Sequence, residues 1–198
     1  VQVSFYSLEK ELTDYRIEAP AKFHKVTGVT PHRHEDGTDH QHVKTRGVYV
    51  VDRVSFDRPG FWRAQFEVTT DGGEQPQAQS VAFPVLGEPQ APGLGETVPA
   101  TRNLTLSDVG SIDEIETRVP PDNMHDLSVA QALELGNPFV VVFATPMFCV
   151  TRMCGPVTDI AAVLHERFRD QVSFIHIEPW DLQIARSEGR LVPTEIAL

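Results

Sequence analysis

Cysteine and basic charge are both scarce in this chain of 198 residues, which has two cysteines and 17 lysines and arginines against 28 acidic residues. The formal net charge of −11 argues against broad binding to nucleic acid or anionic membrane, because both need a basic surface. No apolar run approaches the ~20 residues of a membrane-spanning helix, and these residues show no n-region, h-region or initiator methionine. From the abrupt start at Val1 we expect a processed or trimmed product.

The first part of the chain has the alternation of β-strands. Trp62, Ala64, Phe66 and Val68 alternate with polar residues, which is typical of a strand with one face on a core. Pro84, in the expected strand 81–85, indicates an edge strand. Short strands separated by turns predict an all-β, immunoglobulin-like antiparallel sandwich over residues 1–86, with Trp62 as its core anchor.

A second domain is expected after a linker rich in proline and glycine, residues 87–108. Within residues 109–198, Ser128 and Gln131 have capping-box spacing and open a helix that should end at Gly136. The uninterrupted apolar run 140–143 predicts a strand covered on both faces. A helix after it, with Pro156 in its first turn, and a strand over 172–177 complete a parallel strand–helix–strand unit of an α/β domain. The apolar face of that helix is expected to comprise Val157, Ile160, Ala161, Leu164 and Phe168.

The two cysteines, Cys149 and Cys154, lie between this strand and this helix with CxxxxC spacing. Cys154 is expected at or just before the helix N-terminus, where backbone N–H groups and the nearby Arg152 would lower its thiol pKa. Because Cys149 is in the preceding loop, it can fold back toward Cys154. We therefore predict a reversible Cys149–Cys154 disulfide, while the sequence leaves open which sulfur attacks a substrate.

These residues resemble a known family. The run 140–143, the cysteine loop and Cys154-Gly-Pro156 resemble the thioredoxin fold, although Val157 stands where the thioredoxin signature has its second cysteine. With Met124-His-Asp-Leu127 before a short helix, the chain is similar to bacterial extracytoplasmic thioredoxin-like proteins that carry an N-terminal immunoglobulin-like domain. The resemblance covers residues 137–198 and implies a thioredoxin-like domain that is incomplete at its C-terminus.

The same resemblance implies a function. The protein would be a thiol-disulfide oxidoreductase that needs no organic cofactor, with Cys149 and Cys154 as catalytic residues and protein thiols or disulfides as partners. It would be periplasmic, displayed on the cell surface or secreted, with tethering to the membrane through a segment absent from this chain as one mode of localisation.

Three alternatives remain open at this point. The chain can be a non-enzymatic accessory subunit of a membrane or surface assembly, with a structural disulfide. The cysteine loop also resembles single-chain peroxiredoxins, but Thr145 is four residues before Cys149 where their threonine is three residues before the cysteine. Sco-type copper chaperones resemble it too, although their cysteines have CxxxC spacing.

Four histidines in the segment 32–42 are a candidate metal site: His32, His34, His40 and His42. Two His-x-His pairs suit copper or zinc, while the alternative is a solvated loop that binds metal only adventitiously. His176 and Glu178 share one face of the second strand, where they can either serve a site or, as we expect, leave His176 as a satisfied strand residue. His125 is expected to be a local hydrogen-bonding group.

Overall fold

The computed structural model describes residues 1–9, 15–25, 32–33, 39–40, 47–68, 77–149 and 153–197. The chain is mixed α/β and forms two compact units, Val1–Lys25 with Arg46–Thr97, and Val98–Leu198 with Val26–Thr45. The boundary after Thr97 falls inside the predicted linker 87–108. None of the described helices is long and apolar enough to cross a membrane.

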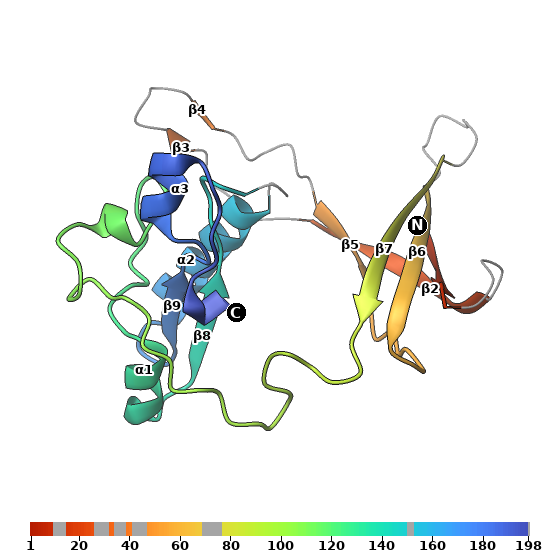
Figure 1. Cartoon of the computed structure of the whole chain (residues 1–198), viewed down its shortest axis with the longest axis horizontal. Helices are drawn as coiled ribbons and strands as arrows, with labels where there is room; N and C mark the ends of the chain where they lie inside the picture. The colour runs from red at the N-terminus through yellow and green to blue at the C-terminus, as the bar shows by residue number, and fades with distance from the viewer. Residues whose placement is uncertain are drawn as a thin grey trace. The chain divides into compact units, whose positions relative to one another are not determined.

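Five antiparallel strands form one curled sheet in the first unit (Figure 1). The order across the sheet is β5 (Gly47–Val51), β2 (Tyr15–Lys25), β1 (Gln2–Ser7), β6 (Gly60–Val68) and β7 (Gln77–Val85). The first half of β2 pairs with β1 and its second half with β5. Strand β7 is at the edge of the sheet and has a neighbour on one side only, so the sheet tolerates the backbone N–H that Pro84 lacks. The edge position predicted from Pro84 is confirmed.

The described strands therefore differ from the predicted two-sheet sandwich. Trp62 is fully buried, as predicted, and its indole Nε1 donates to the Arg58 carbonyl (3.3 Å). Phe56, in the connection before β6, stacks edge-on against Trp62, Phe5 and Phe83 with ring centroids 4.8 to 5.7 Å apart. This aromatic connection covers the sheet face that a second sheet was expected to cover.

The second unit contains the parallel pair β8 (Phe139–Phe143) and β9 (Ser173–Ile177), joined through α2 (Cys154–Phe168). The predicted strand–helix–strand unit is thus present (Figure 1). The other elements are α1 (Val129–Leu135), α3 (Leu182–Glu188), the 3-10 turns η2 (Ile112–Glu114) and η3 (Glu195–Ala197), and the short pair β3 (His32–Arg33) and β4 (Asp39–His40).

The predicted boundaries of α1 are confirmed in detail. Ser128 accepts the amide of Gln131 at 3.2 Å, and the Gln131 side chain accepts the Ser128 amide at 2.8 Å. Gly136 ends the helix in the left-handed conformation, with φ of 70°. Both termini follow from local chemistry, because the reciprocal cap satisfies free amides and glycine accepts a positive φ without a steric penalty.

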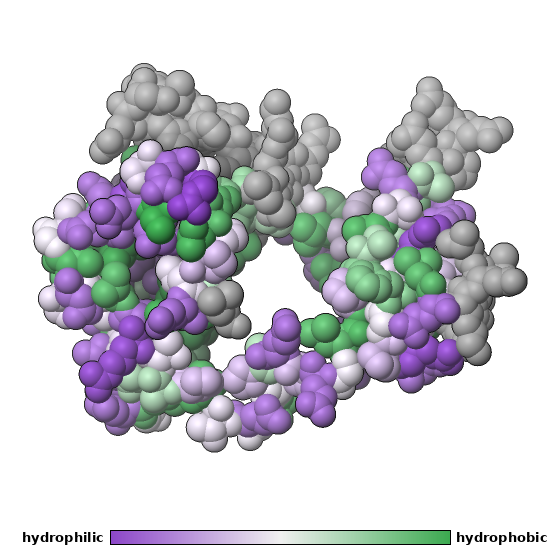
Figure 2. Space-filling model, in the orientation of Figure 1, coloured by the Kyte–Doolittle hydropathy of each residue, from purple (hydrophilic) through white to green (hydrophobic). Residues whose placement is uncertain are grey.

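Two burial predictions in the same unit are wrong. β8 is not covered on both faces, since Val140 and Phe143 are 40% and 51% exposed. On α2, Val157 and Leu164 are exposed, while Thr158 and Asp159 face the interior beside Ala161. Short two-stranded pairing leaves one side of β8 open, and a buried ion pair, described below, draws Asp159 inward. Figure 2 shows hydrophobic residues in green among hydrophilic ones on the visible faces of both units.

Candidate functional site

The cysteines lie together at the start of α2. Cys154 is the first residue of the helix, and its amide donates to the sulfur of Cys149 at 3.2 Å. Cys149 thereby accepts an N–H group that a capping side chain accepts in other helices. Both residues are partly exposed and no disulfide joins them, so the predicted bond is not formed in this structure. The expectation that Cys149 folds back onto the helix terminus is confirmed.

The prediction that the pKa of Cys154 is lowered is wrong. Burial and the hydrogen bond with Cys149 raise the pKa of the Cys154 thiol above its ordinary value. The sequence argument placed Cys154 correctly, but its amide donates to the sulfur of Cys149 and not to its own. The amide instead favours negative charge on Cys149. Arg152, the predicted thiolate-stabilising residue, lies outside the described residues.

Thr117 connects the cysteine loop to a buried carboxyl group. Its hydroxyl accepts the amide of Met147 at 3.2 Å and donates to Glu178 Oε1, which also accepts the Thr117 amide at 3.0 Å. Burial raises the pKa of Glu178, and the Thr117 hydrogen bond acts in the opposite direction. The loop that carries Cys149 is thus held to the segment that follows η2.

That segment carries three of four residues in a buried polar group, which we call the His–carboxylate cluster: Glu116, Asp122, His125 and His176. His125 Nε2 donates to Glu116 Oε2 at 2.8 Å, and His176 Nδ1 donates to Asp122 Oδ2 at 2.9 Å. The two crossed separations, His125 Nε2 to Asp122 Oδ1 and His176 Nδ1 to Glu116 Oε2, are 3.4 and 3.5 Å. Every member is at most 1% exposed at its side chain.

The cluster is charged in the absence of any metal. Burial opposes ionisation, yet hydrogen bonds from the two imidazoles keep the pKa values of Glu116 and Asp122 below their usual range. Burial also disfavours the imidazolium forms, but hydrogen bonds to the carboxylates raise the pKa of His125 to about 9 and that of His176 to about 10. Two negative carboxylates therefore face two protonated imidazoles.

The segment that supplies these groups is fixed on two sides. Its Arg118 guanidinium donates to Asp159 Oδ1 of α2 at 2.8 and 3.1 Å. Its Glu116 Oε1 accepts the amides of Thr117 and Arg118 at 3.1 and 2.9 Å. The cluster is therefore orientated by backbone and α2 contacts as well as by its own hydrogen bonds.

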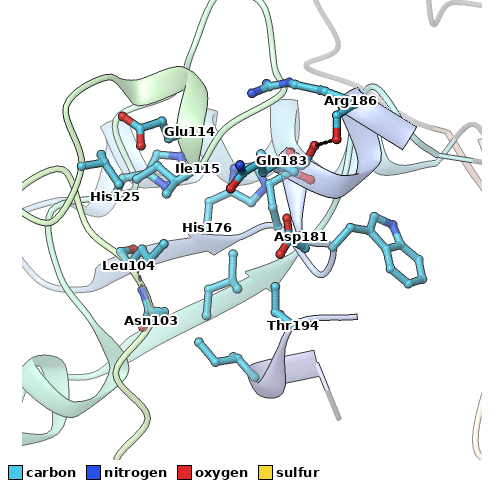
Figure 3. Close-up of a pocket in the computed structure, with 17 residues that line it drawn as sticks. Asn103, Leu104, Glu114, Ile115, His125, His176, Asp181, Gln183, Arg186 and Thr194 are labelled. Atoms are coloured by element: carbon cyan, nitrogen blue, oxygen red, sulfur yellow. Dashed lines mark hydrogen bonds between the residues drawn. The ribbon is translucent and has the colours of Figure 1, made fainter. Parts of the chain in front are cut away.

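His125 and His176 also line a pocket of about 790 Å³ within the second unit. Figure 3 shows Glu114, Ile115 and His125 along one part of the wall and Gln183 and Arg186 of α3 along another. Glu178 and Trp180 line the pocket too, and Glu178 Oε2 and Trp180 Nε1 are buried without a hydrogen-bond partner. Polar groups therefore converge on a largely apolar recess.

The predicted metal site of His32, His34, His40 and His42 falls largely outside the described residues. His34 and His42 lie beyond them, and for His32 and His40 only the backbone is described, with the two residues paired across β3 and β4. The group that can hold a metal ion, among the described residues, is instead the His–carboxylate cluster.

Sequence reasoning missed Glu116 and Asp122 and gave His125 a purely local role. The expectation that His176 is a satisfied strand residue is confirmed, since its Nε2 also donates to the Ala144 carbonyl at 3.2 Å. One available signal was the alternation of His176 and Glu178 with isoleucines in an otherwise apolar strand, because a buried polar side chain requires a partner. The chain matches no protein-family model, and the comparisons with curated proteins and with solved structures found no similar protein.

Proposed function

We propose that the protein is a thiol-disulfide oxidoreductase that acts through Cys149 and Cys154. The observation that carries this proposal is the contact of the Cys149 sulfur with the first amide of α2, beside a second, partly exposed thiol. A sulfur that accepts a helix N-terminal N–H is favoured as a thiolate, which is the reactive form in disulfide exchange.

The two cysteines receive different roles in this mechanism. The Cys149 thiolate attacks one sulfur of a partner disulfide, forms a mixed disulfide and releases the other partner sulfur as a thiolate. Cys154 then loses its proton and attacks the Cys149 sulfur, which releases the second partner thiolate and leaves a Cys149–Cys154 disulfide. The raised pKa of Cys154 suits the second role, because its thiol stays protonated until Cys149 has reacted.

The finer features of the fold belong to the same proposal. Strand β8, the cysteine loop, α2 and β9 correspond to the half of a thioredoxin-like domain that bears the cysteines. We assign the five-stranded unit a supporting role comparable to that of an immunoglobulin-like domain. An extracytoplasmic location, with protein thiols and disulfides as partners, fits a pair of cysteines in an otherwise cysteine-free chain.

The decisive experiment traps the mixed disulfide. In Cys154→Ser, a complex between Cys149 and a disulfide-containing protein such as insulin should persist, whereas Cys149→Ser should form none. The unsubstituted protein should reduce insulin with a thiol donor. Failure of insulin reduction, together with a redox potential below the ~−300 mV of structural disulfides, would favour the accessory subunit instead.

A separate proposal concerns the histidine segment 32–42, for which copper or zinc remains the expected ligand. The observation in its favour is the backbone pairing of His32 with His40 across β3 and β4. Titration with copper and zinc of the chain and of a His32, His34, His40, His42→Ala variant tests it. Equal binding by both proteins at micromolar metal would remove the idea.

A further inference from the structure

We propose that the His–carboxylate cluster is a binding site for one divalent cation of the zinc type, held by Glu116 Oε2, Asp122 Oδ2, His125 Nε2 and His176 Nδ1. The site is distinct from the cysteine pair and from the histidine segment 32–42. Its role is to fix the loop that carries Glu116, Asp122 and His125 onto strand β9.

The spacing of the donor atoms fits a four-coordinate ion. Zinc bonds of ~2.0–2.1 Å in a tetrahedron place ligand atoms ~3.3 Å apart. Three nitrogen–oxygen separations among these four atoms are 2.8, 2.9 and 3.5 Å, and one candidate ligand atom from each residue lies within 4.8 Å of the others. An ion at the centre thus needs only small side-chain movements.

The chemistry of the donors also fits. Two imidazoles with two carboxylates are a ligand set for zinc, and thiolates are not required. Ionised carboxylates and neutral imidazoles are the forms that bind zinc, and two carboxylates balance the charge of one divalent cation.

Groups around the cluster hold the ligands in the orientation that a metal needs. His176 Nε2 lies 3.2 Å from the Ala144 carbonyl, and an N–H there leaves the lone pair of a neutral imidazole on Nδ1. The amides of Thr117 and Arg118 donate to Glu116 Oε1, while Oε2 accepts the Asp122 amide at 3.3 Å and faces the imidazoles with its remaining lone pair. The amide of Met124 supports Asp122 through Oδ1 at 3.0 Å.

The burial of the cluster indicates a structural rather than a catalytic ion. Four protein ligands fill all the positions of a tetrahedral ion, and each ligand side chain is at most 1% exposed, as in a structural zinc site. Residues 116–126 contain no helix or strand, so few backbone ladder bonds hold them in place. A cation that joins Glu116, Asp122 and His125 to His176 supplies that constraint.

The test uses the full chain with His32, His34, His40 and His42 replaced by alanine, so that the histidine segment cannot contribute. After treatment with a chelator and dialysis, this background protein is titrated with Zn²⁺ and Co²⁺, and the metal content and melting temperature are measured. His125→Gln and His176→Asn, which keep a hydrogen-bonding nitrogen near the original position, are compared with it. His165→Asn, on α2 outside the cluster, is the matched control.

We expect the background protein and the His165→Asn control to bind one Zn²⁺ per chain and to melt at a higher temperature with it. His125→Gln and His176→Asn should each weaken binding by at least ~10-fold, the effect typical of altered metal-site residues. Bound Co²⁺ should give the intense visible absorption of a four-coordinate ion without a thiolate charge-transfer band.

Three results would overturn the site. They are no Zn²⁺ bound by the background protein, unchanged affinity in folded His125→Gln and His176→Asn, and a Co²⁺ spectrum that is six-coordinate or shows thiolate ligation. If the two variants do not fold, the stoichiometry and the Co²⁺ spectrum of the background protein decide alone. If zinc binding is lost while insulin reduction is kept, the two proposals are shown to be independent.

Discussion

Removal of one buried hydroxyl tests the proposed connection between the cysteine loop and the acidic interior. In Thr117→Val the side chain keeps its shape, but the Met147 amide loses its acceptor and Glu178 Oε1 loses one of its two donors from Thr117. Thr117 is buried, at 4% exposure, so water does not readily replace the hydroxyl. We therefore expect the second unit to be destabilised and the Cys149 loop to be less firmly held.

The size of the effect follows from these two losses. An unpaired buried amide costs about 1–3 kcal/mol, and a hydrogen bond to a charged acceptor contributes about 1.5–3 kcal/mol. Met147 is half exposed and the Thr117 amide still donates to Glu178, which reduces both terms. We expect a loss of about 2–4 kcal/mol in the free energy of unfolding of the second unit.

Urea unfolding followed by far-UV circular dichroism measures this loss, because all the described α-helices lie in the second unit. The matched control is Thr117→Ser, which keeps the hydroxyl and loses only the methyl group. It should therefore retain the hydrogen bonds to the Met147 amide and to Glu178. If the two variants lost the same free energy within ~0.5 kcal/mol, the assigned role of the Thr117 hydroxyl would be refuted.

Three further predictions concern other parts of the chain. At neutral pH iodoacetamide should label Cys149 before Cys154, because burial and the contact with Cys149 raise the pKa of the Cys154 thiol. Labelling of Cys154 should accelerate only when the pH rises past the ordinary pKa of a cysteine thiol. Equal labelling rates at pH 7, measured by peptide mapping, would contradict this. Ser128→Ala should cost about 1 kcal/mol in urea unfolding through loss of the α1 cap, whereas Ser128→Asp should keep most of it. Trp62→Ala should destabilise the first unit by about 3–5 kcal/mol, and a loss below ~1 kcal/mol in strand-specific hydrogen exchange would show that Trp62 does not anchor the core.

Features set by local chemistry could be predicted from the sequence. The first and last residues of α1 are set by Ser128 and Gly136, which act within one or two helical turns. The edge position of β7 could be predicted from Pro84 alone. The strand–helix–strand unit follows from apolar runs that are long enough to recognise. In each case the determining atoms are close together in the chain.

Features set by distant partners could not be predicted. The inward orientation of Asp159 depends on Arg118, 41 residues away, and the partner of His176 is Asp122, 54 residues away. The strand β2 was also missed, although Tyr15, Ile17, Ala19, Ala21 and Phe23 alternate with polar residues and Pro20; a proline inside such a run argues against a paired strand. Pairing between segments without periodicity leaves no pattern that a single sequence displays.

The bond from the Cys154 amide to the Cys149 sulfur gives the helix terminus a built-in spectroscopic reporter. Alkylation or oxidation of Cys149 removes the proposed thiolate charge that this N–H faces. The resonance of the Cys154 amide proton then moves upfield, and the exchange of this proton with solvent becomes faster. A single nitrogen–proton cross-peak, followed during titration with oxidant, then records the chemistry of one sulfur without any label on the sulfur itself.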